Sequence, residues 1–391
     1  MQNKTFLKLI VLTTFLVSFL MSILLSLPER FMVANALEAN EINSKAFCLI
    51  EQNSGEVLTE KDSKKHLPIA SVTKTMTLLL TFEAIEQGKF GVDDLLVCSK
   101  RANGMGGSQV FLDADAEYKV DDLLYAVVLS SANDASVVFA EAIAGTEENF
   151  VKLMNEKAKE LGLSDTNFVN CTGLPANNHY SCAYDVAQIM KELTKHTIYF
   201  NYTKERLRDF VHPSGRITQM TNTNKLVRFY DGCDAGKTGS TVEAGYCLAA
   251  TAKRNDMRLI SVVLGAENSK QRFADCTKVF DYGFNNFELK TLVDEKQQID
   301  FPNKIAKAKQ TQILVKPQKS YYEIVKKGEE NQKTANFKFF DVSAPKMKDD
   351  VVGKIYITKN NEVCDEIDII LCDNVEQKTY LDGFKEALSN W

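Results

Sequence analysis

Three short motifs hold the residues of this sequence that are best suited to covalent chemistry. Residues 71–74 form the pattern S-x-x-K, residues 131–133 form S-x-N, and residues 237–239 form K-T-G. Each pattern alone recurs by chance in a chain of 391 residues, but the three in this order are a strong combined signal. They supply a nucleophile, a base and an anion-binding group, which together predict acyl transfer through a serine. The candidate residues are Ser71, Lys74, Ser131, Asn133, Lys237, Thr238 and Gly239.

The first motif pairs a serine with a lysine one helical turn later. Residues three apart lie on the same face of a helix, so Lys74 is able to reach the hydroxyl of Ser71. A serine hydroxyl is a poor nucleophile until a neighbouring base takes its proton. A lysine, with an ordinary pKa of about 10.4, becomes such a base only where burial or a second cation lowers its pKa. We expect both causes at Lys74, with Lys237 as the second cation.

The other two motifs predict the remaining roles of an acyl-transfer site. Ser131 is expected to relay a proton to the leaving amine, and Asn133 to hold Lys74 and the substrate amide by hydrogen bonds. Lys237 and Thr238 are expected to bind a substrate carboxylate. Gly239 has no Cβ, so its backbone is able to approach a ligand closely.

A Ser–His–Asp arrangement is not indicated. The sequence holds only four histidines, at positions 66, 179, 196 and 212, and no G-x-S-x-G pattern. We expect all four histidines at surface or loop positions. The structural alternative for Ser71 is a helix N-cap serine followed by a surface lysine, and the two partner motifs argue against it.

The residues around the motifs predict the elements that must position them. Residues 46–51 and 56–60 flank an N-S-G turn, which indicates a hairpin. The apolar stretch that follows Ser71 fits a helix, and residues 120–161 form a long helical region. Within that region Thr146 precedes two acidic residues, which is typical of a helix start.

Strand-like runs follow the third motif. Residues 245–252 and 257–265 are apolar and are joined by R-N-D, which predicts a second hairpin. Residues 272–284 read as a closing helix. A strand pair, then helices, then strands and a last helix indicate an α+β fold in which distant segments meet in a sheet covered by helices.

A second, small all-β domain is predicted after a linker-like stretch at residues 290–309. The chain therefore divides into a catalytic domain at 37–290, a β-rich domain at 291–376 and a tail at 377–391. The second domain carries no obvious chemistry. Its expected strands are residues 312–315, 321–325, 337–340, 353–358 and 362–371.

The two ends of the chain predict its location. Lys4 and Lys8 precede an apolar run at 9–27, and the small-x-small site Ala34-Asn35-Ala36 follows, so we expect a signal peptide at 1–36, with an uncleaved membrane anchor as the alternative. The enzyme is then extracytoplasmic and attached to the membrane or wall. Residues 378–391 place apolar side chains on one helical face, which suggests peripheral contact with the outer face of the cytoplasmic membrane. The alternative is a short helix docked on the β domain.

Composition excludes several other classes of function. The net charge of -5 argues against a nucleic-acid partner. The nine cysteines are odd in number and form no CxxC or Cys/His cluster, so neither a metal site nor a disulfide scaffold is indicated, and no cofactor is expected. Most cysteines are expected to be buried, and a Cys364–Cys372 cross-strand bridge is a further hypothesis.

With these motifs in place, the sequence resembles low-molecular-weight penicillin-binding proteins, the D-alanyl-D-alanine carboxypeptidases of the serine peptidase clan shared with β-lactamases. The resemblance extends from about residue 46 to 287 and includes Pro68-Ile69-Ala70-Ser71, Gly173-Leu174-Pro175 and Ala235-Gly236-Lys237-Thr238-Gly239. It implies an antiparallel sheet flanked by helices. It also implies that Arg272 helps to bind the terminal carboxylate, and that the N–H groups of Ser71 and Ser240 form the oxyanion hole.

The resemblance implies removal of the last D-alanine from peptidoglycan stem pentapeptides, with β-lactams as inhibitors. A DD-endopeptidase, a β-lactamase and a non-catalytic wall-binding protein are the alternatives. Two departures from the family pattern stand out. Thr172 occupies a position where some relatives have histidine, and no ExxLN-type glutamate is found, which argues against efficient β-lactam hydrolysis.

Overall fold

The computed structural model describes residues 41–303 and 305–382 of the chain. The predicted signal peptide, residues 1–36, and the larger part of the predicted tail, residues 377–391, lie outside these ranges. Among the described helices, none has both the length and the apolar composition that crossing a membrane requires.

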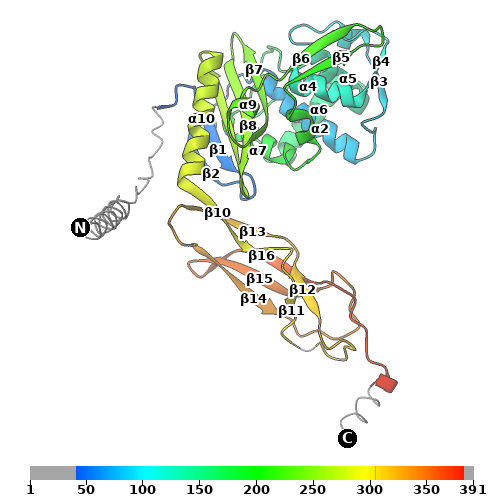
Figure 1. Ribbon diagram of the computed structural model, residues 1–391, viewed down its shortest axis with the longest axis vertical. Coiled ribbons are helices and arrows are strands. Elements are labelled where there is room, and N and C mark those ends of the chain that lie inside the picture. Colours follow the sequence, from blue (N-terminus) through cyan, green and yellow to red (C-terminus); the bar gives the residue numbers. More distant parts are fainter. Residues whose placement is uncertain (1–40, 304, 383–391) are drawn as a thin grey trace, which may run out of the picture. The chain divides into compact units, whose positions relative to one another are not determined.

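The part of the chain that holds the three motifs, residues 41–286, is called the catalytic region below. A five-stranded antiparallel sheet forms its centre (Figure 1). Its strand order is β2-β1-β9-β8-β7. The pairing of β1 with β9 brings residues 46–51 against residues 259–264, more than two hundred positions away along the chain. The predicted α+β fold, with distant segments meeting in one antiparallel sheet, is confirmed. The strands are β1 (Ala46–Glu51), β2 (Val57–Lys61), β7 (Cys233–Thr241), β8 (Gly245–Arg254) and β9 (Met257–Ala266).

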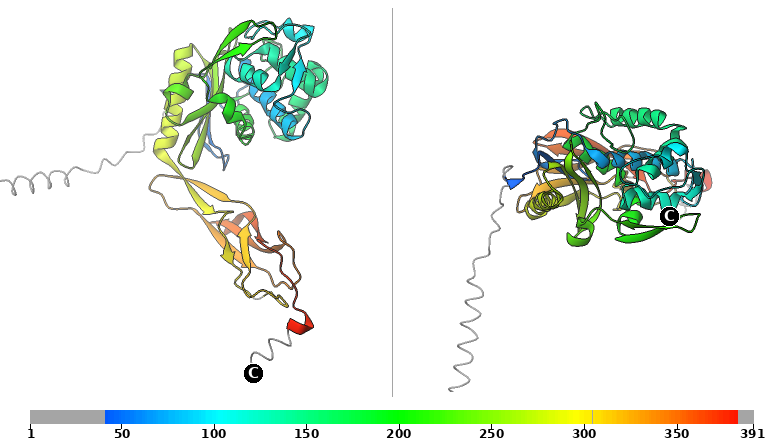
Figure 2. Two further views of the ribbon diagram at one scale, coloured as in Figure 1. Left: turned by 45° about the vertical axis from the view of Figure 1, so that its right-hand side comes forward. Right: turned by 90° about the horizontal axis from the view of Figure 1, so that it is seen from above.

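Helices cover both faces of this sheet (Figures 1 and 2). Helix α10 (Ser269–Asn286) lies on one face, and α7 (Ala183–Leu193) lies on the other with most of the remaining helices. Side chains of β9 pack on both faces of the sheet, because successive side chains of a strand point to opposite faces. Ile260 and Val262 join the main core, whereas Leu259 packs against α10, where a Cβ on Gly283 would lie only 2.5 Å from the leucine side chain.

The long helical region predicted at 120–161 consists of three helices. Thr146 caps the third of them, because its hydroxyl accepts a hydrogen bond from the N–H of Asn149 at 3.1 Å. The first break falls at Ser131, whose φ of 59° is left-handed and ends the helix. This break brings the second motif to the start of α5. The helical elements are η2 (Ala70–Thr73), α2 (Lys74–Glu86), α3 (Lys100–Asn103), α4 (Val120–Leu129), α5 (Asn133–Ala144), α6 (Glu147–Glu160), α8 (Tyr199–Thr203) and α9 (Leu226–Phe229).

Two short hairpins complete the catalytic region. One pairs β3 (Leu95–Val97) with β4 (Glu117–Lys119), and the other pairs β5 (Leu207–Val211) with β6 (Ile217–Thr221). The second hairpin packs on the loop that precedes the S-x-N motif, as described below.

The C-terminal region is all β, as predicted. A second five-stranded sheet has the order β11-β12-β16-β15-β14, and a two-stranded sheet pairs β10 with β13. Strand β10 crosses the start of the predicted linker at 290–309, so part of that stretch is strand and pairs with β13. The strands are β10 (Phe287–Val293), β11 (Ile299–Asp300), β12 (Leu314–Pro317), β13 (Tyr321–Lys326), β14 (Lys333–Phe339), β15 (Val351–Lys359) and β16 (Glu362–Leu371).

All nine cysteines are free thiols, and seven of them are buried. The expectation of mostly buried cysteines is therefore confirmed, but the Cys364–Cys372 bridge is wrong. Cys364 lies in β16 and Cys372 directly follows that strand. Eight residues of extended chain span about 26 Å, whereas a disulfide needs its Cα atoms within about 7 Å.

Candidate active site

Ser71 and Lys74 meet at the start of helix α2. Ser71 lies in the 3-10 turn η2, and Lys74 is the first residue of α2. The Nζ atom of Lys74 lies 3.0 Å from Ser71 Oγ, so the contact expected from the spacing is present. It also lies 2.6 Å from Asn133 Oδ1 and 2.7 Å from the carbonyl oxygen of Thr172. Because Asn133 and Thr172 come from distant parts of the chain, the tertiary fold fixes the position of the amine.

The surroundings of Lys74 favour its neutral form. The side chain is fully buried, and burial lowers its pKa to about 7. Asn133 Oδ1 and the Thr172 carbonyl are only able to accept hydrogen bonds, so they take two N–H bonds from the amine in either protonation state. In the neutral amine the lone pair then faces Ser71, the only one of the three neighbours that has a hydroxyl proton to give.

The second motif lies on the other side of Lys74. The side-chain amide of Asn133 accepts from Lys74 and donates to the Gly106 carbonyl at 2.7 Å, which leaves one N–H of Nδ2 for another partner. Ser131 is 4% exposed, and its Oγ has no hydrogen-bond partner among the described residues. An unpaired buried hydroxyl is costly, which is consistent with a group that pairs with a substrate.

Strand β7 carries the third motif past the nucleophile at the edge of the sheet. Gly239 is the point of closest approach: a Cβ there would lie 2.8 Å from the carbonyl oxygen of Ile69 and 2.9 Å from the Ser71 nitrogen. Only glycine allows this contact. The next residue, Ser240, is exposed near the end of the strand. Thr238 is buried, and its Oγ1 donates to Thr223 Oγ1 at 2.8 Å.

Two further cations lie beside this strand. Lys237 is 1% exposed, and its Nζ donates to the Thr238 carbonyl at 3.2 Å. Arg272 reaches β7 from helix α10, where its Nη1 donates to the carbonyls of Gly239 at 3.2 Å and Cys247 at 3.3 Å. Its Nε has no hydrogen-bond partner among the described residues. Buried cations with hydrogen-bond donors left over suit an anion.

Burial lowers the pKa values of these cations, and at Lys237 neighbouring positive charges add to the shift. Burial lowers the pKa of both Lys237 and Arg272, and the charges of Lys74 and Arg272 lower that of Lys237 further. At Lys74 burial lowers the pKa while Cys171 and Asp134 oppose the shift, so the expected lowering by Lys237 as a second cation is not found. A bound carboxylate would relieve the repulsion within this group.

The loop at 170–174 contributes groups that the motifs did not reveal. Thr172 holds Lys74 through its carbonyl, while its hydroxyl donates to Asn170 Oδ1 at 3.1 Å. The departure from relatives with histidine at position 172 therefore leaves the contact to Lys74 intact. At Gly173 a Cβ would lie only 1.9 Å from the Ala70 carbonyl, so only glycine fits beside the nucleophile turn. Backbone groups such as these leave no motif in the sequence.

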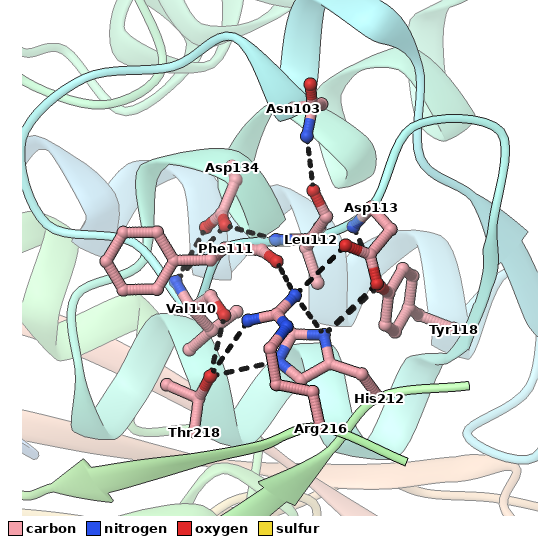
Figure 3. Close-up of polar contacts among 10 residues, drawn as sticks. All are labelled: Asn103, Val110, Phe111, Leu112, Asp113, Tyr118, Asp134, His212, Arg216 and Thr218. Atoms are coloured by element: carbon pink, nitrogen blue, oxygen red, sulfur yellow. Dashed lines mark hydrogen bonds and ion pairs between the residues drawn. The ribbon is translucent and has the colours of Figure 1, made fainter. Parts of the chain in front are cut away.

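A buried carboxylate next to Asn133 fixes another loop beside the site (Figure 3). Asp134 accepts hydrogen bonds from the N–H groups of Val110 and Leu112, both at 3.1 Å. The N–H of Asn133 in turn donates to the Ser108 carbonyl at 2.7 Å. The loop that binds both the side chain and the backbone of Asn133 is therefore tied to the helix that carries this residue.

The β5–β6 hairpin holds the same loop from the opposite side (Figure 3). Thr218 Oγ1 donates to the Val110 carbonyl at 3.1 Å, and Arg216 Nη2 lies 3.1 Å from Asp113 Oδ1. His212 connects Thr218 of the hairpin with Tyr118. Its Nε2 lies 2.9 Å from Thr218 Oγ1, and its Nδ1 lies 3.2 Å from Tyr118 Oη. Burial lowers the pKa of His212, so it serves here as a neutral polar group.

All four histidines lie in loops, as expected, but His179 and His212 are buried. His179 contacts the first motif, since its Nε2 lies 2.8 Å from Thr73 Oγ1. Its Nδ1 accepts from the N–H of Val169 at 3.1 Å, which assigns the ring proton to Nε2. Burial lowers the pKa of His179 to about 4. It is a neutral support for the nucleophile turn, and none of the four histidines contacts Ser71 in the described part of the chain.

A cluster with metal-ligand side chains lies at the start of α7. The ligand atoms of Asp165, Cys182 and Asp185 lie within 4.8 Å of one another. Each has a protein partner: Asp185 accepts from Thr166 Oγ1 at 2.7 Å, Cys182 accepts from the Asp185 N–H, and Asp165 pairs with His66 at 2.9 Å. These contacts cap the helix and fix the preceding loop.

A pocket of about 250 Å³ opens beside the nucleophile turn. One wall is the turn before Ser71, another is the loop at 173–177, and the third is the end of β7 with the following turn. Glu243 brings a carboxylate to its rim. The lining residues are Pro68, Ile69, Ala70, Gly173, Leu174, Pro175, Ala176, Asn177, His179, Thr241 and Glu243.

Comparisons with known proteins identify the relatives of this chain. The sequence profile of the family "D-alanyl-D-alanine carboxypeptidase" matches residues 33–268, and that of "Penicillin-binding protein 5, C-terminal domain" matches residues 287–377. D-alanyl-D-alanine carboxypeptidase DacF of Bacillus subtilis is 38% identical over 371 residues, covering 93% of this chain and 94% of that protein. DacC of Escherichia coli is 31% identical over 363 residues, covering 90% and 88%.

The fold agrees as well. The crystal structure of penicillin binding protein 5 from Haemophilus influenzae superimposes with a TM-score of 0.68 at 29% identity, covering 86% of this chain and 98% of that one. Both the catalytic region and the C-terminal β region of this chain thus have matches in sequence, and the fold has one in a solved structure. The chain belongs to the D-alanyl-D-alanine carboxypeptidase family of serine hydrolases.

Proposed function

We propose that this carboxypeptidase removes the terminal D-alanine of peptidoglycan stem pentapeptides, with Ser71 as nucleophile and Lys74 as its base. The observation that carries the assignment is the set of three contacts made by Lys74 Nζ. Two carbonyl-type oxygens, at 2.6 Å and 2.7 Å, occupy two of its N–H bonds, and Ser71 Oγ lies at 3.0 Å. A pKa of about 7 leaves a large share of the amine neutral near neutral pH.

The reaction then follows in two steps. Ser71 Oγ attacks the carbonyl carbon of the penultimate D-alanine, while its proton passes to Lys74 Nζ. The N–H groups of Ser71 and Ser240 bind the oxyanion of the tetrahedral intermediate. The proton returns through Ser131 to the leaving nitrogen, the C–N bond breaks, and D-alanine departs. Water attacks the acyl-serine and gives a proton to Lys74. Lys74 then returns a proton to Ser71 Oγ as the ester bond breaks, which releases the shortened peptide with a new terminal carboxylate.

The carboxylate of the terminal D-alanine defines the exopeptidase. We assign it to the buried cations Lys237 and Arg272 together with the hydroxyl of Thr238. Lys237 and Arg272 are 1% and 7% exposed, so a carboxylate between them forms hydrogen bonds in a dry environment, where they are strong. Gly239 brings the backbone of β7 against the substrate, and Asn133 offers its second amide N–H.

The remainder of the stem peptide is assigned to the pocket beside Ser71. Its volume of about 250 Å³ suits a few amino-acid residues, and Glu243 at the rim suits a cationic side chain of the peptide. β-Lactams are expected to occupy the same cleft and to acylate Ser71. The ester then persists, because no additional glutamate base of the ExxLN type is found in the sequence.

The rest of the chain is assigned as follows. A signal peptide at 1–36 exports the catalytic domain at 37–290, followed by a β-rich domain at 291–376 and a tail at 377–391 that contacts the membrane surface. The pairing of β10 with β13 supports a domain boundary a few residues earlier, at 286/287. The enzyme is then extracytoplasmic and attached to the membrane or wall.

The experiment that tests the assignment is D-alanine release from a diacyl-Lys-D-Ala-D-Ala tripeptide by the chain from Leu37 onward. Ser71→Ala is the control, and we expect release only from the wild type. No release from a folded wild-type protein would overturn the proposal. Cleavage of purified cross-linked dimers would then identify an endopeptidase, rapid hydrolysis of a penicillin a β-lactamase, and failure to bind a penicillin a non-catalytic wall protein.

A further inference from the structure

We propose that a basic pocket beside strand β7, separate from the pocket at Ser71, binds free carboxylates of the peptidoglycan polymer outside the peptide that is being cut. This inference rests on the proposed function, because it takes peptidoglycan as the substrate. The basic pocket has a volume of about 520 Å³. Its lining comes from residues 204–206, 221–222, 224–225 and 227–229.

The charge of this pocket is strongly positive in a chain whose net charge is -5. Lys204, Arg206, Lys225 and Arg228 are exposed, and none of them forms an ion pair within the described ranges. The single carboxylate in the lining, Glu205, lies 3.6 Å from the guanidinium of Arg208, which Asp121 and Asp122 share, so the lining holds four cations and one anion. Four cations that face one opening without counterions raise the local concentration of anions.

The pocket is built on the same strand as the active site. Asn224 Nδ2 donates to the Ala235 carbonyl of β7 at 3.3 Å. Thr223, which lies between Asn222 and Asn224, accepts a hydrogen bond at 2.8 Å from Thr238 of the K-T-G motif. Two residues that line the basic pocket, Asn222 and Asn224, are therefore sequence neighbours of Thr223, which contacts a group assigned to the substrate carboxylate.

The frame that presents the cations is rigid. Asn222 Nδ2 donates to the carbonyls of Thr203 at 2.9 Å and Glu205 at 3.0 Å, so the two chain segments that line the pocket are joined. Between the cations lies an apolar surface. Phe229 is 69% exposed, and the guanidinium of Arg228 lies 4.8 Å from the centre of its ring. Because the chain segments are already joined, binding has to order only the cationic side chains.

Carboxylate is the anion that the assigned substrate supplies. Arginine presents a planar fork of donors that fits a carboxylate with two hydrogen bonds. Stem peptides end in carboxylates and recur along each glycan strand, so the polymer offers a second anion while the first peptide occupies the active site. Linked binding of two such groups raises the affinity for the polymer without any change for a short peptide.

The test compares the triple variant R206Q/K225Q/R228Q with a matched control, K100Q/K159Q/K253Q. The control removes the same charge from exposed lysines on α3, α6 and β8. Each triple variant is combined with Ser71→Ala, so that binding to purified insoluble peptidoglycan is measured by co-sedimentation without turnover. We expect the pocket variant to lose roughly tenfold or more in affinity and most of its salt dependence, and the control to match the parent.

Two modified polymers identify the anion. Peptidoglycan with amidated carboxylates should bind the parent and the pocket variant equally weakly, because the basic pocket then has no anion to bind, whereas removal of phosphodiester polymers should change nothing. Equal binding by the pocket variant and its parent overturns the proposal, as does binding that depends on phosphate and not on carboxylate. Tripeptide hydrolysis, measured with Ser71 intact, should stay unchanged in both triple variants. If the wild type does not hydrolyse the tripeptide, the proposed function fails, and the binding experiment still decides the role of the basic pocket.

Discussion

The catalytic region and the C-terminal β region differ in what they bury. The catalytic region places the charged side chains of Lys74, Lys237 and Arg272 in its interior around one serine. The described core of the β region consists of apolar side chains such as Val315, Ile355 and Ile369. Ion pairs in that region, for example Lys354 with Glu366, are largely exposed. Its buried Glu323 accepts hydrogen bonds from the backbone N–H groups of Gln332 and Lys333, at the start of β14.

The two regions therefore differ in how their buried side chains affect stability. A buried charge is destabilising unless it is paired, and a buried ion pair rarely adds stability over apolar packing. Three buried basic side chains close together, none of which forms an ion pair within the described residues, are therefore a sign of function and not of stability. The β region shows the arrangement that stability alone favours. We expect changes at the cations to alter chemistry, and changes in the β core to alter folding.

The largest expected effect is the loss of chemistry at the buried centre. Ser71→Ala and Lys74→Ala should each lower the rate of acylation by a penicillin by roughly a thousandfold or more, because nucleophile and base act as one unit. The double variant should be no worse than either single one. The measurement is covalent labelling followed by mass spectrometry. A Lys74→Ala protein that melts normally but still acylates at a tenth of the wild-type rate would contradict the role of Lys74.

A core change in the β region should have the opposite profile. Ile355 is fully buried in β15, and Ile355→Ala is expected to cost about 2–4 kcal/mol in the free energy of unfolding of this region. The acylation rate constant in native conditions should stay within about twofold of the wild type, because every assigned catalytic group lies before residue 287. Denaturant titration and penicillin labelling measure the two quantities. A large fall in the acylation rate at unchanged fold would break the comparison.

Acid should destabilise the catalytic region through a group that the β region lacks. Burial lowers the pKa of His179 from 6.5 to about 4. Between these values the unfolded chain binds a proton that the native chain does not, so stability falls as the pH is lowered from about 6.5 to 4. The expected loss is about 3 kcal/mol, and it stops below pH of about 4.

His179→Gln is the matched control for acid stability. Glutamine keeps a donor and an acceptor for Thr73 and Val169 but does not titrate in this range. Denaturant unfolding at several pH values should therefore show a smaller acid loss in the variant. The β region contains no histidine, so its unfolding should not show this step. Identical pH profiles for wild type and variant would exclude His179 as the cause.

Much of the fold could be predicted because the hydrophobic pattern is regular. The hairpin at 46–60, the strands near 245–265 and the capped helix after Thr146 all follow from alternation or helical spacing. The prediction of a linker at 290–309 was wrong in part, because its first residues belong to β10. This strand is half-buried, and buried and exposed side chains alternate only weakly along it. The Cys364–Cys372 bridge failed because the predicted strand at 362–371, which is present as β16, by itself keeps the two residues far apart.

The site was predictable where side chains carry it, and only there. The contact between Ser71 and Lys74 follows from helical spacing, whereas the positions of Arg272 and Ser240 came from family resemblance alone. The carbonyls of Thr172 and Gly106 hold the site through the backbone, which any residue type supplies, so no motif marks them. The tie from Asp134 to its loop is likewise visible only in three dimensions.

The smallest expected effect is the pH dependence of acylation, and it tests the buried centre most directly. Only neutral Lys74 is able to take the Ser71 proton, and its pKa is lowered to about 7. The second-order rate constant for penicillin acylation should therefore rise about tenfold per pH unit below 7 and level off above it. Asn133→Asp is a control for which the direction of the pKa change is known in advance. A carboxylate in place of the amide oxygen 2.6 Å from Nζ favours the ammonium form, so the midpoint should move to higher pH. A flat profile, or a midpoint that does not respond to this variant, would remove Lys74 as the base and leave the buried cations as groups that only bind the substrate.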